Sequence, residues 1–367
     1  MLERFHVPTD AEVRVTATAL RATVESIFTA LGIPEEDARQ GADVLLYADL
    51  RGVETHGVSN MLRVYVNQYK EGQLDPTGAL TVLRERPSTA AVDGGNTLGI
   101  FQGPKAMRIA IEKARETGAG IVTVRNVGHT GAVGYHALLA ADEDMIGVSL
   151  TAGGALVVPT FGAEPRLGTN PIALAAPTRN LPTFLFDAAT SAVAGNKLIL
   201  ASRLGVTLHP GWIASWNGTP IMEEAYLPER GQFAQLPLGS TREMGSHKGY
   251  GLAVMNEILS SVLGSALPSM LDHGAPGGGA GSKQFLAAYD ISAFCDVDGF
   301  KDALDAMLQE LLDTPPAPGH DRVIYPGVAE HEALAQRTAH GIPLHPEVID
   351  WFNTTCDDLG IARLDTM

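Results

Sequence analysis

The stretch GIVTVRNVGHTGAVG, residues 120–134, joins a strand-like run to a glycine-rich turn that carries a histidine. Valine, isoleucine and threonine are frequent in residues 121–127, which is typical of a β-strand. The glycines that follow allow a positive φ and let a ligand approach the backbone closely. His129 on such a turn is able to exchange a proton near neutral pH, although a histidine beside glycines can also be purely structural.

The chain around this stretch alternates short strand-like runs with glycine-rich turns. The runs occupy residues 121–125, 146–151, 172–176 and 184–187, at spacings too irregular for regular βαβ repeats. No G-x-G-x-x-G string occurs despite 40 glycines, so the pyrophosphate turn of the standard Rossmann fold is absent. The G-x-S-x-G, H-E-x-x-H and P-loop signatures are also missing, which argues against the common hydrolase and kinase classes.

Helical patterns are concentrated towards the two ends of the chain. Thr9 and Glu12 have the spacing of a capping box, and apolar residues then recur at helical intervals up to Leu31, which predicts a helix. Gly32 ends it, and Pro34 suits the first turn of a second helix over residues 35–47. We also predict helices over residues 58–69, 104–117, 246–263, 300–312 and 346–359, and strands over residues 80–84 and 285–291.

The length of the chain, and the different sequence patterns of its middle and its ends, predict two domains. Residues 130–285 form a glycine-rich unit, and residues 1–129 and 286–367 combine both chain ends into a helical or mixed unit. The loop HGAPGGGAGS, residues 273–282, lies near the end of the first unit.

The composition is that of a globular chain with an excess of acidic residues. The 367 residues include 26 Lys and Arg against 42 Asp and Glu, a formal net charge of −16. This charge disfavours binding to nucleic acid or anionic membranes, and an anionic substrate would need local positive charge. Cys295 and Cys356 form no C-x-x-C motif or disulfide framework, and no run approaches the ~18 apolar residues of a membrane span. We therefore expect a cytoplasmic protein, and no histidine spacing suggests a metal site.

The string GSHKGYGLA, residues 245–253, predicts an anion site at the start of a helix. Ser246 is a plausible N-cap, which places Lys248 in the first turn. A basic residue there opposes the helix dipole, unless an anion lies beside both the lysine and the free N–H groups. Gly249 and Gly251 leave room for a close approach.

Two further strings admit both a structural and a functional interpretation. FDAATS, residues 186–191, ends a strand with small side chains whose backbone N–H groups could hold a phosphate or ribose, and it could equally be an ordinary strand exit. In DLRGVETHGVSNM, residues 49–61, His56 lies between two predicted helices. That histidine could anchor a loop or donate a proton.

Together with GHTGAVG and LGTNPIA (residues 167–173), these strings resemble the type-2 malate/L-lactate dehydrogenase family. The resemblance implies an α/β fold, a three-layer α/β/α arrangement around a mixed sheet with a non-Rossmann cofactor site, and a homodimer. It also implies a cytoplasmic oxidoreductase that transfers a hydride between NAD (NADP possible) and C2 of a small 2-oxo or 2-hydroxy acid. Residues 130–285 would then bind the cofactor, and the other unit would bind substrate and form the dimer.

The resemblance also assigns the site residues. His56 would donate the proton, His129 would polarise or orient the carbonyl, and Thr55, Asn60 and Arg63 would bind the small anionic substrate. The cofactor would be held by Asp187, Ala188, Ala189, Thr190, Ser191, His247, Lys248, Gly249 and Arg322.

The chain departs from the family pattern at three positions. Many relatives have an arginine at the position of Asn60, and here Arg63, about one turn later, could replace it on the same helical face. Thr130 stands where an aromatic residue is common, and Ser215 where an acid is common. His136 is interpreted as structural. The alternatives are a cyclic imine reductase of the same fold, a nucleotide-binding member without turnover and, least supported, a metal-dependent hydrolase.

Overall fold

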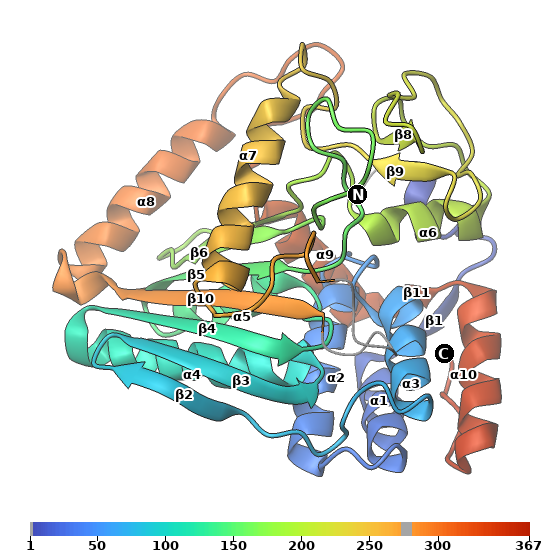
Figure 1. Ribbon diagram of the computed structural model, residues 1–367, viewed down its shortest axis with the longest axis horizontal. Helices are drawn as coiled ribbons and strands as arrows, with labels where there is room; N and C mark the ends of the chain where they lie inside the picture. Colours follow the sequence, from blue (N-terminus) through green and yellow to red (C-terminus); the bar gives the residue numbers. More distant parts are fainter. Residues whose placement is uncertain (1–2, 273–280) are drawn as a thin grey trace.

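A seven-stranded mixed sheet forms the centre of the computed structural model, which describes residues 3–272 and 281–367 (Figure 1). The strand order is β2-β3-β4-β10-β5-β6-β7, and only the β3–β4 pair is parallel. The strands are β2 (Thr81–Arg86), β3 (Thr89–Thr97), β4 (Ala119–Val127), β5 (Met145–Ala152), β6 (Ile172–Ala176), β7 (Phe184–Ala188) and β10 (Ser282–Asp290). The six strands predicted from the sequence all occur within this sheet.

Helices cover both faces of the sheet because its central strands are apolar on both sides. On β10, Leu286 and Ala288 pack against α4 (Gly99–Thr117), whereas Phe285 and Ala287 face the opposite side. The helix α5 (Val133–Ala141) lies on the α4 face. The segment α7 (Ser246–Asn256) with η3 (Glu257–Val262) covers the other face. This confirms the predicted three-layer α/β/α arrangement.

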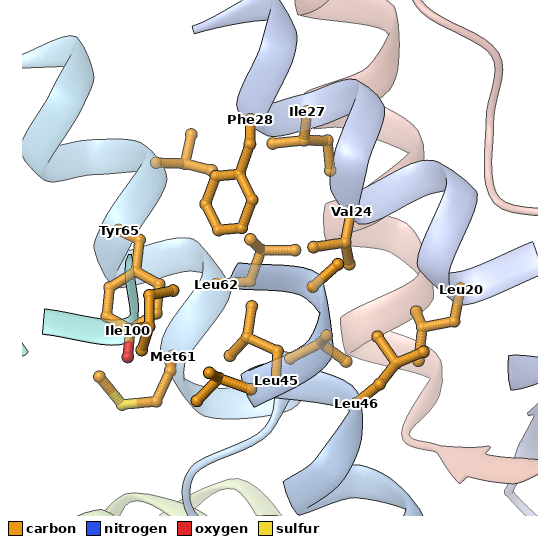
Figure 2. Close-up of a cluster of buried hydrophobic side chains, with 14 of the residues drawn as sticks. Leu20, Val24, Ile27, Phe28, Leu45, Leu46, Met61, Leu62, Tyr65 and Ile100 are labelled. Atoms are coloured by element: carbon orange, nitrogen blue, oxygen red, sulfur yellow. The ribbon is translucent and has the colours of Figure 1, made fainter. Parts of the chain in front are cut away.

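Both chain ends build a helical cluster at one end of the sheet (Figure 1, lower right). Its elements are β1 (Val13–Val15), α1 (Ala17–Ala30), α2 (Glu35–Leu50), η2 (Val58–Leu62), α3 (Arg63–Lys70), β11 (Ile342–Leu344) and α10 (Pro346–Leu359). Figure 2 shows the apolar core that these helices share, with Phe28, Leu62 and Tyr65 among its buried side chains. Phe352 of α10 is buried in the same cluster, so the C-terminal helix is part of the N-terminal core.

The remaining elements lie outside the seven-stranded sheet. They are η1 (Glu3–Phe5), α6 (Gly195–Leu204), β8 (Ile213–Ser215), β9 (Phe233–Gln235), η4 (Ile291–Ala293), α8 (Val297–Leu312) and α9 (Val328–His340). The helix α6 and the β8–β9 hairpin pack around the buried ring of Phe5. None of the helices in the described ranges has the length and apolar composition needed to cross a membrane.

Several local predictions are wrong. The capping box at Thr9 does not start a helix, because residues 13–15 pair as β1 with β11, and α1 begins later at Ala17. Thr16 is its N-cap and accepts a hydrogen bond from the Ala19 N–H at 3.1 Å. Pro34 is the N-cap of α2 rather than a first-turn residue.

The start of α7 and two other helices also differ from expectation. Ser246 is the first residue of α7, and the cap is Gly245, which has a φ of +97°. The Ser246 hydroxyl instead lies 3.0 Å from that of Thr160. The helices α6 and α9 were not predicted. Most of the 273–282 loop, residues 273–280, lies outside the described residues.

The predicted domain boundary near residue 285 passes through β10. This strand pairs with β4 on one side and β5 on the other, so strands from both predicted units share one sheet. The assignment of cofactor binding and substrate binding to separate units stays a prediction.

Candidate active site

A cavity of about 560 Å³ lies between the helical cluster, the β4–α5 turn and the start of α6. It has the size of an ordinary small-molecule site. Its lining combines two histidines with the exit of β7 and the first turn of α6. The lining includes Thr55, His56, His129, Asp187, Ala188, Ala189, Ser191, Asn196, Lys197, Trp212, Leu238 and Glu330.

The two histidines predicted as catalytic lie together in this cavity. The rings of His56 and His129 are stacked, with centroids 5.6 Å apart and planes inclined by 16°. His56 comes from the loop after α2, and His129 from the turn after β4. Residues 73 positions apart in the chain therefore face the same ligand space.

Asp49 shapes the loop that carries His56. Its carboxylate accepts a hydrogen bond from the Val58 N–H at 2.9 Å, at the start of η2. A Cβ at Gly57 would overlap the same carboxylate, so the glycine after His56 permits the close turn. The Thr55 hydroxyl lies 2.9 Å from Nδ1 of His56 and completes the local hydrogen bonding.

The surroundings of His129 select one tautomer of its neutral ring. The Gly131 N–H donates to Nδ1 at 3.1 Å, and the Tyr65 hydroxyl lies 2.7 Å from the same nitrogen. Because a backbone N–H can only donate, Nδ1 is an acceptor and the neutral ring carries its proton on Nε2. Nε2 forms no hydrogen bond among the described residues, so this proton is available to a ligand.

Burial disfavours the charged form of both histidines. Loss of solvation lowers the pKa of His56 to about 4. Burial and, secondarily, the neighbouring His56 also lower the pKa of His129. The lowered pKa values favour two neutral imidazoles in the free site at neutral pH, because desolvation penalises the charged form.

The strand exit FDAATS also lines the cavity, through Asp187, Ala188, Ala189 and Ser191. The Asp187 carboxylate accepts a 2.7 Å hydrogen bond from the Gly134 N–H, in the first turn of α5. Burial nevertheless raises the pKa of Asp187 to about 6, and the nearby Glu330 carboxylate adds to this. Small side chains beside it leave space for a flat ligand.

The FDAATS turn and the start of α7 meet at one residue of the lining. The Leu238 N–H donates to the Thr190 carbonyl at 2.9 Å. A Cβ at Gly249 would lie 2.5 Å from the Leu238 nitrogen, so α7 approaches this turn closely because residue 249 is glycine. His247 and Lys248 are exposed and do not line the cavity itself.

Besides Thr190, His247, Lys248 and Gly249, three predicted residues lie outside the cavity lining: Asn60, Arg63 and Arg322. Arg63 forms a 2.5 Å ion pair with Glu347 of α10. Arg322 forms two hydrogen bonds, of 2.7 and 2.6 Å, with exposed Glu332. Asn60 accepts a bond from Arg203 at 2.8 Å and donates to the Asn196 carbonyl at 3.1 Å, which joins η2 to the first turn of α6.

The residues at the three departures and His136 have structural partners. His136 is buried, with Nε2 2.9 Å from the Thr130 carbonyl, as its structural interpretation requires. Thr130 is buried as well. Ser215 donates to the Asn217 side chain at 2.6 Å within the β8 turn.

Sequence reasoning missed Lys197, Trp212 and Glu330, which all line the cavity. It also missed the buried ion pair between Glu54 and Arg337, at 2.6 Å, which ties α9 to the His56 loop. No motif marks these residues. Prediction of the helices α6 and α9 could have pointed to two of them, because Lys197 lies in the first turn of α6 and Glu330 in the first turn of α9.

Comparisons of the whole chain with known proteins show its family. The sequence profile of the malate/L-lactate dehydrogenase family matches residues 15–353. The malate dehydrogenase of Pyrococcus horikoshii is 39% identical over 367 residues, covering 99% of this chain and 100% of that protein. The L-sulfolactate dehydrogenase of Methanocaldococcus jannaschii is 32% identical over 91% of this chain and 94% of its own.

A solved structure is also similar. The crystal structure of malate dehydrogenase from Entamoeba histolytica superposes with a TM-score of 0.91 at 33% identity, covering 96% of this chain and 99% of that chain. The match of profile, sequence and fold over nearly the whole length shows that the chain belongs to the malate/L-lactate dehydrogenase family.

Proposed function

We propose that this protein is an NAD-dependent dehydrogenase that interconverts a small 2-hydroxy acid and its 2-oxo acid. The observation that carries the proposal is the stacked pair His56–His129 in a cavity that the FDAATS turn also lines. Proton transfer to or from a substrate oxygen needs positioned groups of this kind. Membership of a family of dehydrogenases supports the reaction class.

The two histidines take different roles in this proposal. His56 accepts the hydroxyl proton during oxidation and returns it to the developing alkoxide during reduction. His129, with its proton on Nε2, donates a hydrogen bond to the substrate oxygen and polarises the carbonyl. Lowered pKa values favour neutral rings, which suits a base for alcohol oxidation.

The residues at the FDAATS wall fit a nicotinamide ring. Ala188 and Ala189 expose little beyond their backbone, the cavity volume admits a flat heterocycle, and Asp187 offers a polar partner. When bound there, the nicotinamide supplies or accepts the hydride. We propose that residues 187–191 hold this end and that Lys248, with Gly249 beside Leu238, holds a phosphate.

We propose NAD(H) rather than NADP(H). NADP differs from NAD by a phosphate on its adenosine ribose, which needs a positive charge beside it. Arg322, the arginine predicted on the cofactor side, is already engaged by Glu332.

Titration with NADH and NADPH, followed by nicotinamide fluorescence, tests cofactor binding directly. The Lys248→Ala variant should bind NADH about tenfold to a hundredfold more weakly, the value of one charge-assisted contact, with the fold retained. Unchanged affinity would remove Lys248 from the cofactor site. A tenfold preference for NADPH would reverse the cofactor assignment.

A substrate panel then separates the reaction classes. Oxaloacetate, pyruvate and cyclic imino acids are offered with NADH, and malate and lactate with NAD. Reduction of the keto acids supports the proposal, and turnover of cyclic imines alone would replace it. A protein that binds NADH but turns over none of these would be a non-catalytic member.

We also propose a cytoplasmic homodimer. Leu252, Met255, Ile258 and Val262 form an apolar stripe along α7 and η3, hereafter the α7 stripe, and these side chains are 37–55% exposed. Such a continuous apolar face is typical of a protein interface. The free thiols of Cys295 and Cys356 are compatible with a reducing compartment.

A further inference from the structure

The cavity contains one lysine that forms no ion pair, whereas nearly all other lysines of the described residues pair with a carboxylate. Lys70, Lys105, Lys113, Lys283 and Lys301 each form an ion pair with a carboxylate. Within residues 3–272 and 281–367, only Lys197 and Lys248 form none, and Lys248 is exposed. Lys197 is largely withdrawn from solvent and lines the cavity. An ammonium without an ion-pair partner in such a place raises the free energy of the folded protein, unless an anionic ligand pairs with it.

A cation–π contact with Phe5 offsets part of the charge of Lys197, and no carboxylate among the described residues forms an ion pair with it. Its ammonium lies 5.9 Å from the centroid of the buried Phe5 ring. It sits in the first turn of α6, where the helix dipole also disfavours a cation. Burial lowers the pKa of Lys197, as expected for an ammonium without a counter-charge. An anion in the cavity would offset both the unfavourable interaction of the ammonium with the helix dipole and the cost of its desolvation.

Arg63, the arginine predicted to hold the substrate, is engaged elsewhere, and so is Arg203. Arg63 and Arg203 both pair with Glu347, at 2.5 and 3.2 Å. No arginine lines the cavity among the described residues, and Lys197 is its only lysine. The Asn60–Asn196 hydrogen bond ties the turn that carries Lys197 to η2, directly after His56.

We propose that Lys197 is the substrate-binding residue that pairs with a carboxylate of the substrate and takes the role predicted for Arg63. This inference rests on the proposed function, because it assumes that the substrate is a 2-oxo or 2-hydroxy acid. It adds the specificity-determining contact: the ammonium selects acids over neutral ketones and alcohols.

Three variants test the proposal in the full-length protein. Lys197→Met removes the charge and keeps the stem, Lys197→Arg keeps the charge, and Lys70→Met removes an exposed lysine outside the cavity as a control. The kcat and KM values for oxaloacetate and pyruvate are measured at saturating NADH. NADH affinity, malate binding by calorimetry and the melting temperature are measured for each variant.

We expect Lys197→Met to raise the KM for a carboxylate substrate, and to weaken malate binding, about 10- to 100-fold. NADH affinity should stay within twofold, and the melting temperature should be unchanged or higher, because a partly buried charge without an ion-pair partner is removed. Lys197→Arg should retain most of the affinity, and Lys70→Met should match the wild type. A penalty confined to oxaloacetate assigns Lys197 to the distal carboxylate, and an equal penalty for pyruvate assigns it to the one beside the carbonyl.

Other results would overturn the inference. An unchanged KM in Lys197→Met, or a loss of NADH affinity in place of substrate affinity, would show that the lysine does not bind the substrate. A wild type that binds NADH but neither binds malate nor turns over these acids would overturn the proposed function as well. Normal turnover together with an unchanged KM in Lys197→Met would overturn this inference alone.

Discussion

At the scale of single residues, the site depends on how two imidazoles are held and on how poorly they are solvated. His56 has Thr55 beside Nδ1, and His129 has Gly131 and Tyr65 at Nδ1, so each ring presents Nε2 to the ligand space. Their stacking at 5.6 Å means that protonation of one ring opposes protonation of the other. The proton-transfer predictions follow from this arrangement.

Removal of the His56 imidazole should affect chemistry more than cofactor binding. We expect His56→Ala to lower kcat about 10²- to 10⁴-fold, the usual contribution of a positioned acid–base group, with NADH affinity preserved. His129→Ala should weaken substrate binding more than NADH binding. Steady-state kinetics and NADH fluorescence measure both effects. Near-normal turnover in His56→Ala would transfer the acid–base role to His129, and normal turnover in both variants would remove this mechanism.

The pH dependence follows from the lowered histidine pKa values. A base must be neutral to accept the hydroxyl proton, and the neutral fraction is lost as the pH falls through its pKa. Because burial lowers the pKa of His56 to about 4, kcat/KM for hydroxy-acid oxidation should stay constant through neutral pH. It should fall only below the ordinary histidine value of about 6.5. Profiles of the wild type and of His56→Ala check this, and a wild-type midpoint at or above 6.5 would contradict it.

Tyr65 should act through His129. Its hydroxyl lies 2.7 Å from Nδ1, while its ring is packed in the helical core (Figure 2). Loss of one such hydrogen bond is worth about 1 kcal/mol, so Tyr65→Phe should lower kcat roughly fivefold. Tyr69→Phe is the matched control, because it removes a comparable buried hydroxyl contact, 2.8 Å from Thr97, without touching a histidine. Equal kcat values in the two variants would exclude a positioning role for Tyr65.

At the scale of elements, the cofactor side of the site depends on how closely α7 approaches the FDAATS turn. Leu238 is the shared contact, since it donates to Thr190 and packs against Gly249. The position of α7 therefore decides whether the FDAATS turn and the GSHKGYGLA string, which are far apart in the sequence, lie close together at the site.

Substitution of two neighbouring glycines on α7 tests this contact. A Cβ at Gly249 would meet the Leu238 backbone at 2.5 Å, so Gly249→Ala should displace the start of α7 and weaken NADH binding at least tenfold. Gly251 has open space at the same position, and Gly251→Ala should bind NADH normally and stabilise the helix by up to about 1 kcal/mol. Fluorescence titration and thermal unfolding distinguish the two variants. Equal NADH affinities would show that this close approach does not matter for the cofactor.

At the scale of the whole molecule, the exposed α7 stripe lies on the layer that covers one face of the sheet (Figure 1). Sedimentation should give a particle of twice the chain mass, and Ile258→Asp should give one of the chain mass, because a charge would have to be buried in the interface. The melting temperature of the wild type should rise with protein concentration, and that of the variant should not. A wild-type monomer at all concentrations would rule out the proposed dimer.

The sequence by itself determined the family, six of the seven sheet strands and most of the helices; β3 (Thr89–Thr97) was missed. Motifs such as GHTGAVG and FDAATS are short continuous strings, so a single sequence is enough to identify them. Runs of consecutive apolar residues predict the strands at 172–176 and 184–187. Both histidines could be selected because their glycine neighbours mark ligand-accessible turns. The false helix start at Thr9 shows the limit of such patterns, because pairing with β11, over three hundred residues away, overrides a local capping signal.

Only the tertiary structure decided which charges face the site. Arg63 lies seven residues after His56, yet it pairs with Glu347, 284 positions later, and leaves Lys197 as the only lysine or arginine lining the cavity among the described residues. The tautomer of His129 and the lowered histidine pKa values likewise arise from Tyr65, Gly131 and burial. Electrostatic interactions and desolvation depend on distance in space, and a single sequence contains no record of those distances.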